Sequence, residues 1–239
     1  MKIKVIAFDA DDTLWDCQSY FLQVEQQYCK LLSPYCDADT ASASLFQTEM
    51  RNMAELGYGC KAFTLSLIEN AVGVSKGRIS ANELLQVMNL GRSLLHLAAE
   101  PLPDVRETLE ALRAKREPGG GAWQMDLAVL TKGELLDQQN KLQRSGLAPF
   151  FDHVSIVSDK SEEAYLQLCR DMSIVPDELL MVGNSFKSDI APALRIGAWA
   201  AHIPFHVTWA HEHTEEYAHE RLFTLSRFGE LLKLVETDV

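Results

Sequence analysis

The stretch that decides the fold lies at the N-terminus and reads Ile3-Lys4-Val5-Ile6-Ala7-Phe8-Asp9-Ala10-Asp11-Asp12-Thr13-Leu14. Its first six residues are mostly apolar and partly β-branched, which is typical of a buried strand in a parallel sheet. This pattern ends abruptly at Asp9, where polar residues begin. Open parallel sheets bind ligands beyond the carboxyl ends of their strands, so we expect Asp9 and Asp11 at a binding edge.

Two kinds of sequence follow this strand. Between residues 17 and 99 apolar residues recur at helical spacing, and strand signals are nearly absent. After residue 100, helix and strand patterns alternate, which indicates βαβ units and a parallel sheet. The sequence therefore predicts an α/β fold: a doubly wound parallel sheet built from residues 1–16 and 100–239, with an inserted helical cap domain at residues 17–99.

The expected elements follow from the same patterns. Expected strands cover residues 3–8, 125–130, 153–157, 179–182 and 199–203. Expected helices cover residues 20–31, 41–56, 62–72, 81–98, 104–115, 135–145, 162–172, 190–196 and 228–235. The breaker at residues 118–121 is expected to form an elongated helix-to-strand turn.

Composition and charge exclude several classes of function. The net charge of −12 disfavours binding to nucleic acid or to an anionic membrane surface. No apolar run reaches the roughly 20 residues that cross a bilayer. The N-terminus enters a strand pattern at once and shows no signal-peptide pattern, so we expect a cytoplasmic protein. The five cysteines have no CxxC spacing and are expected to be thiols.

Polar residues stand at the ends of several expected strands, and this set predicts phosphoryl chemistry. Asp9 can act as a nucleophile and Asp11 as a general acid and base. Thr131 and Lys160 are placed to hold the phosphoryl oxygens, with Lys132 as a further phosphate-binding candidate. Oxygen donors from Asp9, Asp11, Asn184 and Asp189 suit Mg²⁺, which would neutralise phosphate charge in a protein that is itself acidic.

Four spaced motifs resemble those of the haloacid dehalogenase-like hydrolase superfamily. The first motif begins at Ile6-Ala-Phe-Asp9, and the second begins at Leu127-Ala-Val-Leu-Thr131. The third is Lys160 before a helix, and the fourth runs from Met181-Val-Gly-Asn184 to Asp189. The resemblance implies a phosphatase with a helical C1-type cap. It makes Asp9 the nucleophile, Asp11 the acid and base, Thr131 and Lys160 phosphate ligands, and Asp9, the Asp11 carbonyl and the Asn184/Asp189 loop the magnesium ligands.

The chain departs from the family at one position and leaves other functions open. Many relatives carry aspartate where Asn184 stands, which implies weaker metal binding or a greater dependence on Asp189. Family dehalogenases lack the second aspartate of the first motif, whereas this chain keeps Asp11, so hydrolysis of a small phosphorylated metabolite is favoured. A phosphomutase, a 2-haloacid dehalogenase or a catalytically weakened binding protein remains an alternative. The sequence does not decide between a monomer and a homodimer, or identify the substrate.

Residues outside the motifs give weaker expectations. Asp12 and Thr13 are expected to shape the first loop, and Thr13 to hold the orientation of Asp11. The five histidines between residues 202 and 219 are expected to be ordinary surface or rim residues. The glycine-containing break at residues 57–61 is a candidate for presenting Tyr58, Cys60 or Lys61 to substrate.

Overall fold

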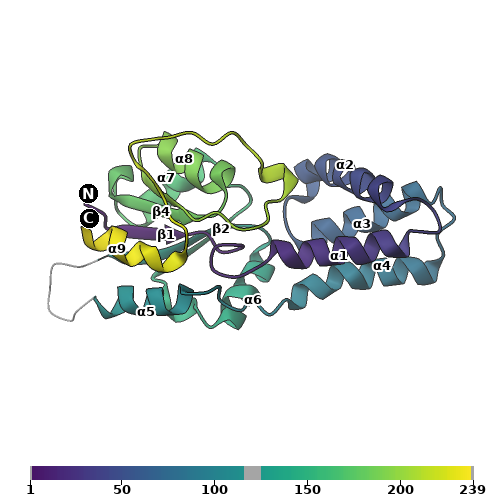
Figure 1. Ribbon diagram of the computed structural model, residues 1–239, viewed down its shortest axis with the longest axis horizontal. Coiled ribbons are helices and arrows are strands. Elements are labelled where there is room, and N and C mark those ends of the chain that lie inside the picture. The colour runs from purple at the N-terminus through teal and green to yellow at the C-terminus, as the bar shows by residue number, and fades with distance from the viewer. Residues whose placement is uncertain (1, 116–124, 238–239) are drawn as a thin grey trace. The chain divides into compact units, whose positions relative to one another are not determined.

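A computed structural model of the protein describes residues 2–115 and 125–237 (Figure 1). The chain divides into two compact units. One comprises residues 1–18, 99–132 and 138–239, and the other residues 19–98 and 133–137. The expected turn at residues 118–121 lies outside the described residues.

The larger unit is a parallel α/β sheet with six strands in the described part of the chain, in the order β3-β2-β1-β4-β5-β6. The strands are β1 (Val5–Phe8), β2 (Asp126–Lys132), β3 (His153–Val157), β4 (Leu179–Gly183), β5 (Trp199–His202) and β6 (Leu222–Thr224). Every neighbouring pair is parallel. The predicted doubly wound sheet is therefore confirmed.

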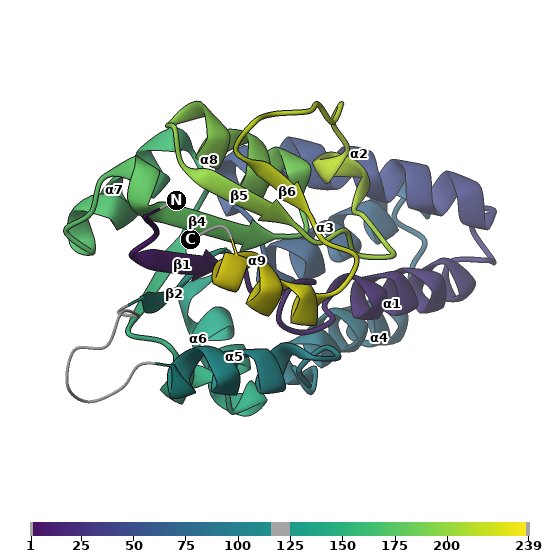
Figure 2. The ribbon, with the colours of Figure 1, turned by 60° about the vertical axis from the view of Figure 1, so that its left-hand side comes forward.

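Helices cover both faces of this sheet, as Figure 2 shows. They are α5 (Val105–Ala114), α6 (Leu135–Ser145), α7 (Glu162–Asp171), α8 (Ala191–Arg195) and α9 (Leu231–Thr237). Fully buried Tyr165 and Leu168 of α7 and Ala193 of α8 pack on the apolar residues of β1, β2 and β4. Phe228, which precedes α9, stacks on Phe8 of β1 with ring centroids 5.7 Å apart. Burial on both faces explains why β1 has no polar alternation.

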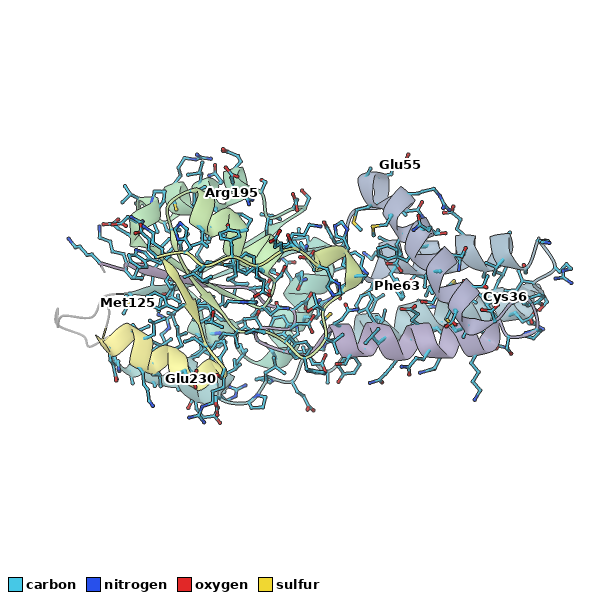
Figure 3. The ribbon with its side chains drawn as sticks, turned by 45° about the horizontal axis from the view of Figure 1, so that its top comes forward. Cys36, Glu55, Phe63, Met125, Arg195 and Glu230 are labelled. Carbon is cyan, nitrogen blue, oxygen red and sulfur yellow. The ribbon has the colours of Figure 1, made fainter. Side chains whose placement is uncertain are left out.

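The smaller unit is helical. It contains α1 (Gln18–Leu31, whose first residue belongs to the larger unit), α2 (Ala38–Leu56), α3 (Cys60–Val74) and α4 (Ala81–Ser93). Its core includes Tyr28, Leu45, Leu67 and Val87, each at most 1% exposed. Phe63, labelled in Figure 3, belongs to the same cluster. This apolar core accounts for the helical spacing of the segment.

The structure corrects several expected boundaries. β2 runs to Lys132, so Thr131 lies inside the strand, whereas the sequence predicted that it follows the strand. The predicted helix 190–196 corresponds to the short α8, and a π-helical turn that the sequence did not predict, Phe186–Ile190, precedes it. β6 was missed because three residues, Leu222–Thr224, are too few to give a period-2 signal. The helices expected at 81–98 and 228–235 each include a 3₁₀ turn, at Leu94–His96 and Phe228–Glu230.

Candidate active site

The site lies where the strand order reverses. β1 has β2 on one side and β4 on the other; the chain leaves β1 toward β2, whereas it leaves the neighbouring β4 toward β5, in the opposite direction. Asp9 follows β1 directly, and its backbone nitrogen donates to Val182 O of β4 at 2.9 Å. The sheet therefore places Asp9 at its topological switch point, with a side chain that is nearly buried.

A buried ion cluster joins three of the predicted residues. Lys160 Nζ pairs with Asp9 Oδ1 and lies 2.6 Å from Asp189 Oδ1. The side chain of Lys160 is 2% exposed and that of Asp189 is 1% exposed. The Lys160 ammonium therefore pairs with two carboxylates, one from the loop after β1 and one from the turn after β4.

The electrostatics of this cluster bring the pKa of Asp9 into the neutral range. Burial, followed by the nearby charge of Asp189, raises the pKa of Asp9 to about 7, although Lys160 opposes this rise. The two carboxylates in turn raise the pKa of Lys160 against the effect of its burial, so the lysine stays charged. An additional cation near Asp9 would make its carboxylate the stable form.

In the loop after β4, the side chain of Asp189 lies unusually close to the backbone of Gly183. A Cβ atom on Gly183 would lie 2.3 Å from Asp189 Oδ2, so this position requires glycine. The backbone nitrogen of Ser185 donates to the same carboxylate at 2.9 Å, and Tyr165 Oη donates to the Ser188 carbonyl at 2.8 Å. The π-helical turn from Phe186 to Ile190 carries Asp189 inward, as such turns do at many functional sites.

Oxygen atoms converge on the side chain of Asn184. Its amide lies 3.0 Å from Thr13 Oγ1, 3.2 Å from Asp9 Oδ2 and 3.3 Å from the Asp11 carbonyl. If the amide nitrogen of Asn184 faces these three oxygens, it donates hydrogen bonds to them. With the amide oxygen inward, Asp9, Asp11 and Asn184 form a set of hard oxygen donors that suits Mg²⁺.

These donors fit the expected cation. No group of three His, Cys, Asp or Glu side chains suited to a metal occurs in residues 2–115 and 125–237. The Asn184 set is of another kind, because it combines one carboxylate with a backbone carbonyl and an amide. Magnesium is often held by one or two carboxylates, with water and phosphate completing its octahedron.

Asp11 belongs to a second cluster, which the sequence analysis missed. Its carboxylate accepts from Lys141 Nζ at 2.7 and 2.8 Å, from Gln138 Nε2 at 2.8 Å and from Trp15 Nε1 at 2.7 Å. Although burial opposes the shift, Lys141 and these hydrogen bonds lower the pKa of Asp11. Gln138 and Lys141 are one helical turn apart on α6 and so lie on the same face of the helix. This i,i+3 spacing is the sequence signal that could have identified them as a pair.

The remaining predicted residues lie around the same edge. Thr131 is buried in β2, two positions beyond the residue that pairs with Phe8. Lys132 Nζ pairs with Glu212 and donates to Ser188 Oγ at 2.9 Å. Thr13 donates to Asp9 at 3.2 Å, so its hydroxyl holds the side chain of Asp9 rather than that of Asp11, which the sequence had predicted. Asp12 has a φ of 65° and accepts from two backbone nitrogens, so it also shapes this loop.

The break between α2 and α3 is tied by polar contacts within the helical unit. Lys61 Nζ pairs with Glu134 at 2.9 Å, and Cys60 Sγ lies 3.4 Å from Asp137 Oδ2. Cys60 is 2% exposed, so its thiol is buried in this structure. All five cysteines lie in the described residues and carry thiols.

A doubly wound parallel sheet with a buried Asp–Lys–Asp cluster at its switch point is an arrangement typical of α/β enzymes. The sequence model of the haloacid dehalogenase-like hydrolases matches residues 3–197. The chain belongs to this family and is a hydrolase.

Two curated relatives and one solved structure illustrate the similarity. A glyceraldehyde 3-phosphate phosphatase of Methanocaldococcus jannaschii is 25% identical, with 99% of this chain and 100% of the relative covered. A second, from Methanothermobacter thermautotrophicus, is 25% identical over 90% and 92% of the two chains. A haloacid dehalogenase-like family hydrolase of Xanthomonas campestris is 29% identical and superposes with a TM-score of 0.86, covering 98% of this chain and 91% of that one.

Among the described residues, none of the helices combines the length and the apolar character needed to cross a membrane.

Proposed function

We propose that this hydrolase is a Mg²⁺-dependent phosphatase of small phosphomonoesters and that it acts through an aspartyl-phosphate on Asp9. One observation carries the proposal. The carboxylate of Asp9 stands at the switch point between a buried ammonium, Lys160, and the oxygen donors around Asn184. A carboxylate can attack a phosphate dianion only where cations offset the repulsion, and this arrangement supplies one cation and fits a second.

In the first proposed step, an Asp9 oxygen attacks phosphorus and the bond to the leaving alkoxide oxygen breaks. Asp11 gives its proton to that oxygen, so the alcohol leaves neutral. Lys160 and the Thr131 hydroxyl hold the phosphoryl oxygens as their charge is redistributed. When bound, Mg²⁺ neutralises phosphate charge and keeps Asp9 ionised at neutral pH.

In the second proposed step, Asp11 accepts a proton from water, and that water attacks phosphorus and breaks the bond to Asp9. An ionised Asp11 suits this step, and four hydrogen bonds from three side chains favour that form of its carboxylate. The first step needs a protonated Asp11. We therefore expect Asp11 to leave Lys141 and take up a proton before the ester is cleaved.

The proposed substrate is a small phosphorylated metabolite. Glyceraldehyde 3-phosphate is the first candidate, since both curated relatives described above are phosphatases of that ester. The helical unit is proposed to act as the cap that excludes bulk water during the reaction. Within it, the half-buried Tyr58 beside the α2–α3 break remains a candidate for substrate contact.

A phosphate-release screen tests this function. We expect turnover of glyceraldehyde 3-phosphate or a related sugar phosphate with Mg²⁺, no turnover in EDTA, and a loss of at least about a thousandfold in Asp9→Asn. Asp39→Asn removes one exposed carboxylate from α2 and serves as the matched control. Full activity in Asp9→Asn would show that Asp9 is not the nucleophile.

The same preparation separates the alternatives. A phosphomutase would return the phosphoryl group to a second hydroxyl without releasing phosphate. A dehalogenase would release chloride from a 2-chloroacid. A protein that only binds ligands would turn over none of these compounds, and its Asp9→Asn variant would behave like the unmodified chain.

A further inference from the structure

The connection between β5 and β6 is long and runs from the catalytic edge of the sheet (Figure 2). We call residues 203–221 the β5–β6 segment. It starts beside the Asn184 loop, where the Ile203 backbone nitrogen donates to Gly183 O at 2.9 Å. A short 3₁₀ turn, Ala210–Glu212, interrupts it. Neither the family motifs nor the proposed mechanism uses any residue of this segment.

Glu212 ties the segment to two parts of the candidate active site. Its carboxylate accepts hydrogen bonds from Ser185 Oγ at 2.5 Å and from Ser188 Oγ at 2.6 Å, and it pairs with Lys132 Nζ. Its side chain is 11% exposed. A surface glutamate would be mobile and solvated, whereas this one meets three donors in a largely dry site.

The contacts around Glu212 form a closed network. Lys132 Nζ also donates to Ser188 Oγ at 2.9 Å, and the Ser188 backbone nitrogen donates to Ser185 Oγ at 3.0 Å. One residue earlier, the His211 carbonyl accepts from Lys187 Nζ at 2.6 Å. The β5–β6 segment is therefore fastened at two consecutive residues to the same turn.

The partners of Glu212 lie next to the proposed ligands. Ser185 follows Asn184, Ser188 precedes Asp189, and Lys132 follows Thr131. A displacement of this turn or of the end of β2 would thus move residues that are proposed to hold metal and phosphate. Burial raises the pKa of Glu212, but the charge of Lys132 and the three hydrogen bonds outweigh this effect and lower the pKa to about 2. The Glu212 carboxylate therefore stays ionised in the neutral range.

We infer that Glu212 is a positioning residue, which locks the β5–β6 segment onto the Ser185–Ser188 turn and the end of β2 and so presets the phosphate-binding geometry. This inference rests on the proposed phosphatase function. In this arrangement Lys132 acts through Glu212, because its charge is already neutralised by the carboxylate. The segment then forms a fixed rim of the site.

Two substitutions and one matched control test the inference. Glu212→Ala removes the contacts of the Glu212 side chain with Ser185, Ser188 and Lys132 and leaves the contact of Lys187 with the His211 carbonyl. Glu212→Gln removes the charge but leaves an amide oxygen that accepts from both serine hydroxyls. Glu215→Ala removes one exposed carboxylate from the same segment and is the control. Steady-state kinetics on the best phosphate ester give KM and kcat, and the shift of Tm with inorganic phosphate and Mg²⁺ reports binding without turnover.

We expect Glu212→Ala to raise KM, and the phosphate concentration that shifts Tm, by about tenfold or more, while kcat changes less than about threefold. Glu212→Gln should recover most of this loss, and Glu215→Ala should match the unmodified protein. Chymotrypsin should cleave Glu212→Ala faster within the segment, after Phe205, Trp209 or Tyr217.

Three outcomes would overturn the inference. A lower KM in both Glu212 variants would make the carboxylate a competitor of the substrate. A lower Tm with unchanged KM and unchanged phosphate binding would make the tie purely structural. If phosphate does not shift the Tm of the unmodified protein, the protein has no phosphate site for Glu212 to position. Phosphate binding without turnover would instead reject only the proposed function, and the Glu212 comparison would still be read from Tm.

Discussion

The Asp9–Lys160–Asp189 cluster offers the sharpest test of the site, through Lys160→Met. Methionine keeps much of the volume of the side chain but leaves two buried carboxylates facing each other without a cation. Removing one partner from a buried ion pair costs about 3–5 kcal/mol, a large part of the roughly 5–15 kcal/mol by which a domain is stable. The same change removes a cation that the mechanism places on the phosphoryl group, so activity should fall about 10²–10³-fold.

A second substitution separates these two effects. Asp189→Asn in the Lys160→Met background removes one of the two facing charges, and burial, the largest cause of the raised pKa of Asp9, still favours a protonated Asp9 in this variant. The double variant should therefore recover most of the lost stability, to within about 1–2 kcal/mol of the unmodified protein, since an unpaired buried polar group costs about that much. It should recover no activity, because no cation has been restored.

The assay is urea unfolding in EDTA, paired with phosphate release in Mg²⁺. Lys30→Met, at an exposed position of α1, is the control and should stay within about 0.5 kcal/mol of the unmodified protein. The reasoning is refuted if the double variant is as unstable as Lys160→Met. It is equally refuted if Lys160→Met keeps full activity.

Three further predictions test single features. Asn184→Asp adds a carboxylate beside Asp9, whose Oδ2 lies 3.2 Å from the Asn184 amide, so it should tighten Mg²⁺ binding at least tenfold in a calorimetric titration. It should also lower stability in EDTA, because like charges at about 4 Å repel by about 4 kcal/mol near a protein surface. Gly183→Ala should displace Asp189 and abolish Mg²⁺-dependent turnover while the far-UV circular dichroism stays unchanged. Burial and Glu25 raise the pKa of Glu49 to about 8, so the folded protein holds a proton that the unfolded chain releases between pH 4.5 and 8, and its stability falls over that window. Glu49→Gln removes this loss, and in urea unfolding it should gain up to about 3 kcal/mol relative to the unmodified protein at pH 8.5 but little at pH 4.5.

The motif residues could be placed from the sequence because strand ends carry spatial information. An apolar run that stops at Asp9, and another that continues to Gly183, reveal two strands whose carboxyl ends share one edge. Lys160 could be included because it lies between a strand and a helix of the same α/β pattern. The roles of these residues in catalysis remain predictions, and their proximity is an observation of the structure.

Other contacts had no usable signal along the chain. Glu212 lies in a segment without periodicity, and its partners are 24, 27 and 80 positions away. The Lys141 contact to Asp11 spans 130 positions. Side-chain pairs of this kind depend on loop paths, which local propensity does not fix.

The sequence by itself determined the sheet class, the helical insertion and the family, because apolar periodicity and the residues at strand ends are local properties. Only the tertiary structure decided which charges face one another: Lys160 between Asp9 and Asp189, Lys141 on Asp11, and Glu212 on Lys132. The physical reason is that a buried charge is stable only beside its partner, and the partner is chosen by how distant segments pack rather than by their order in the chain.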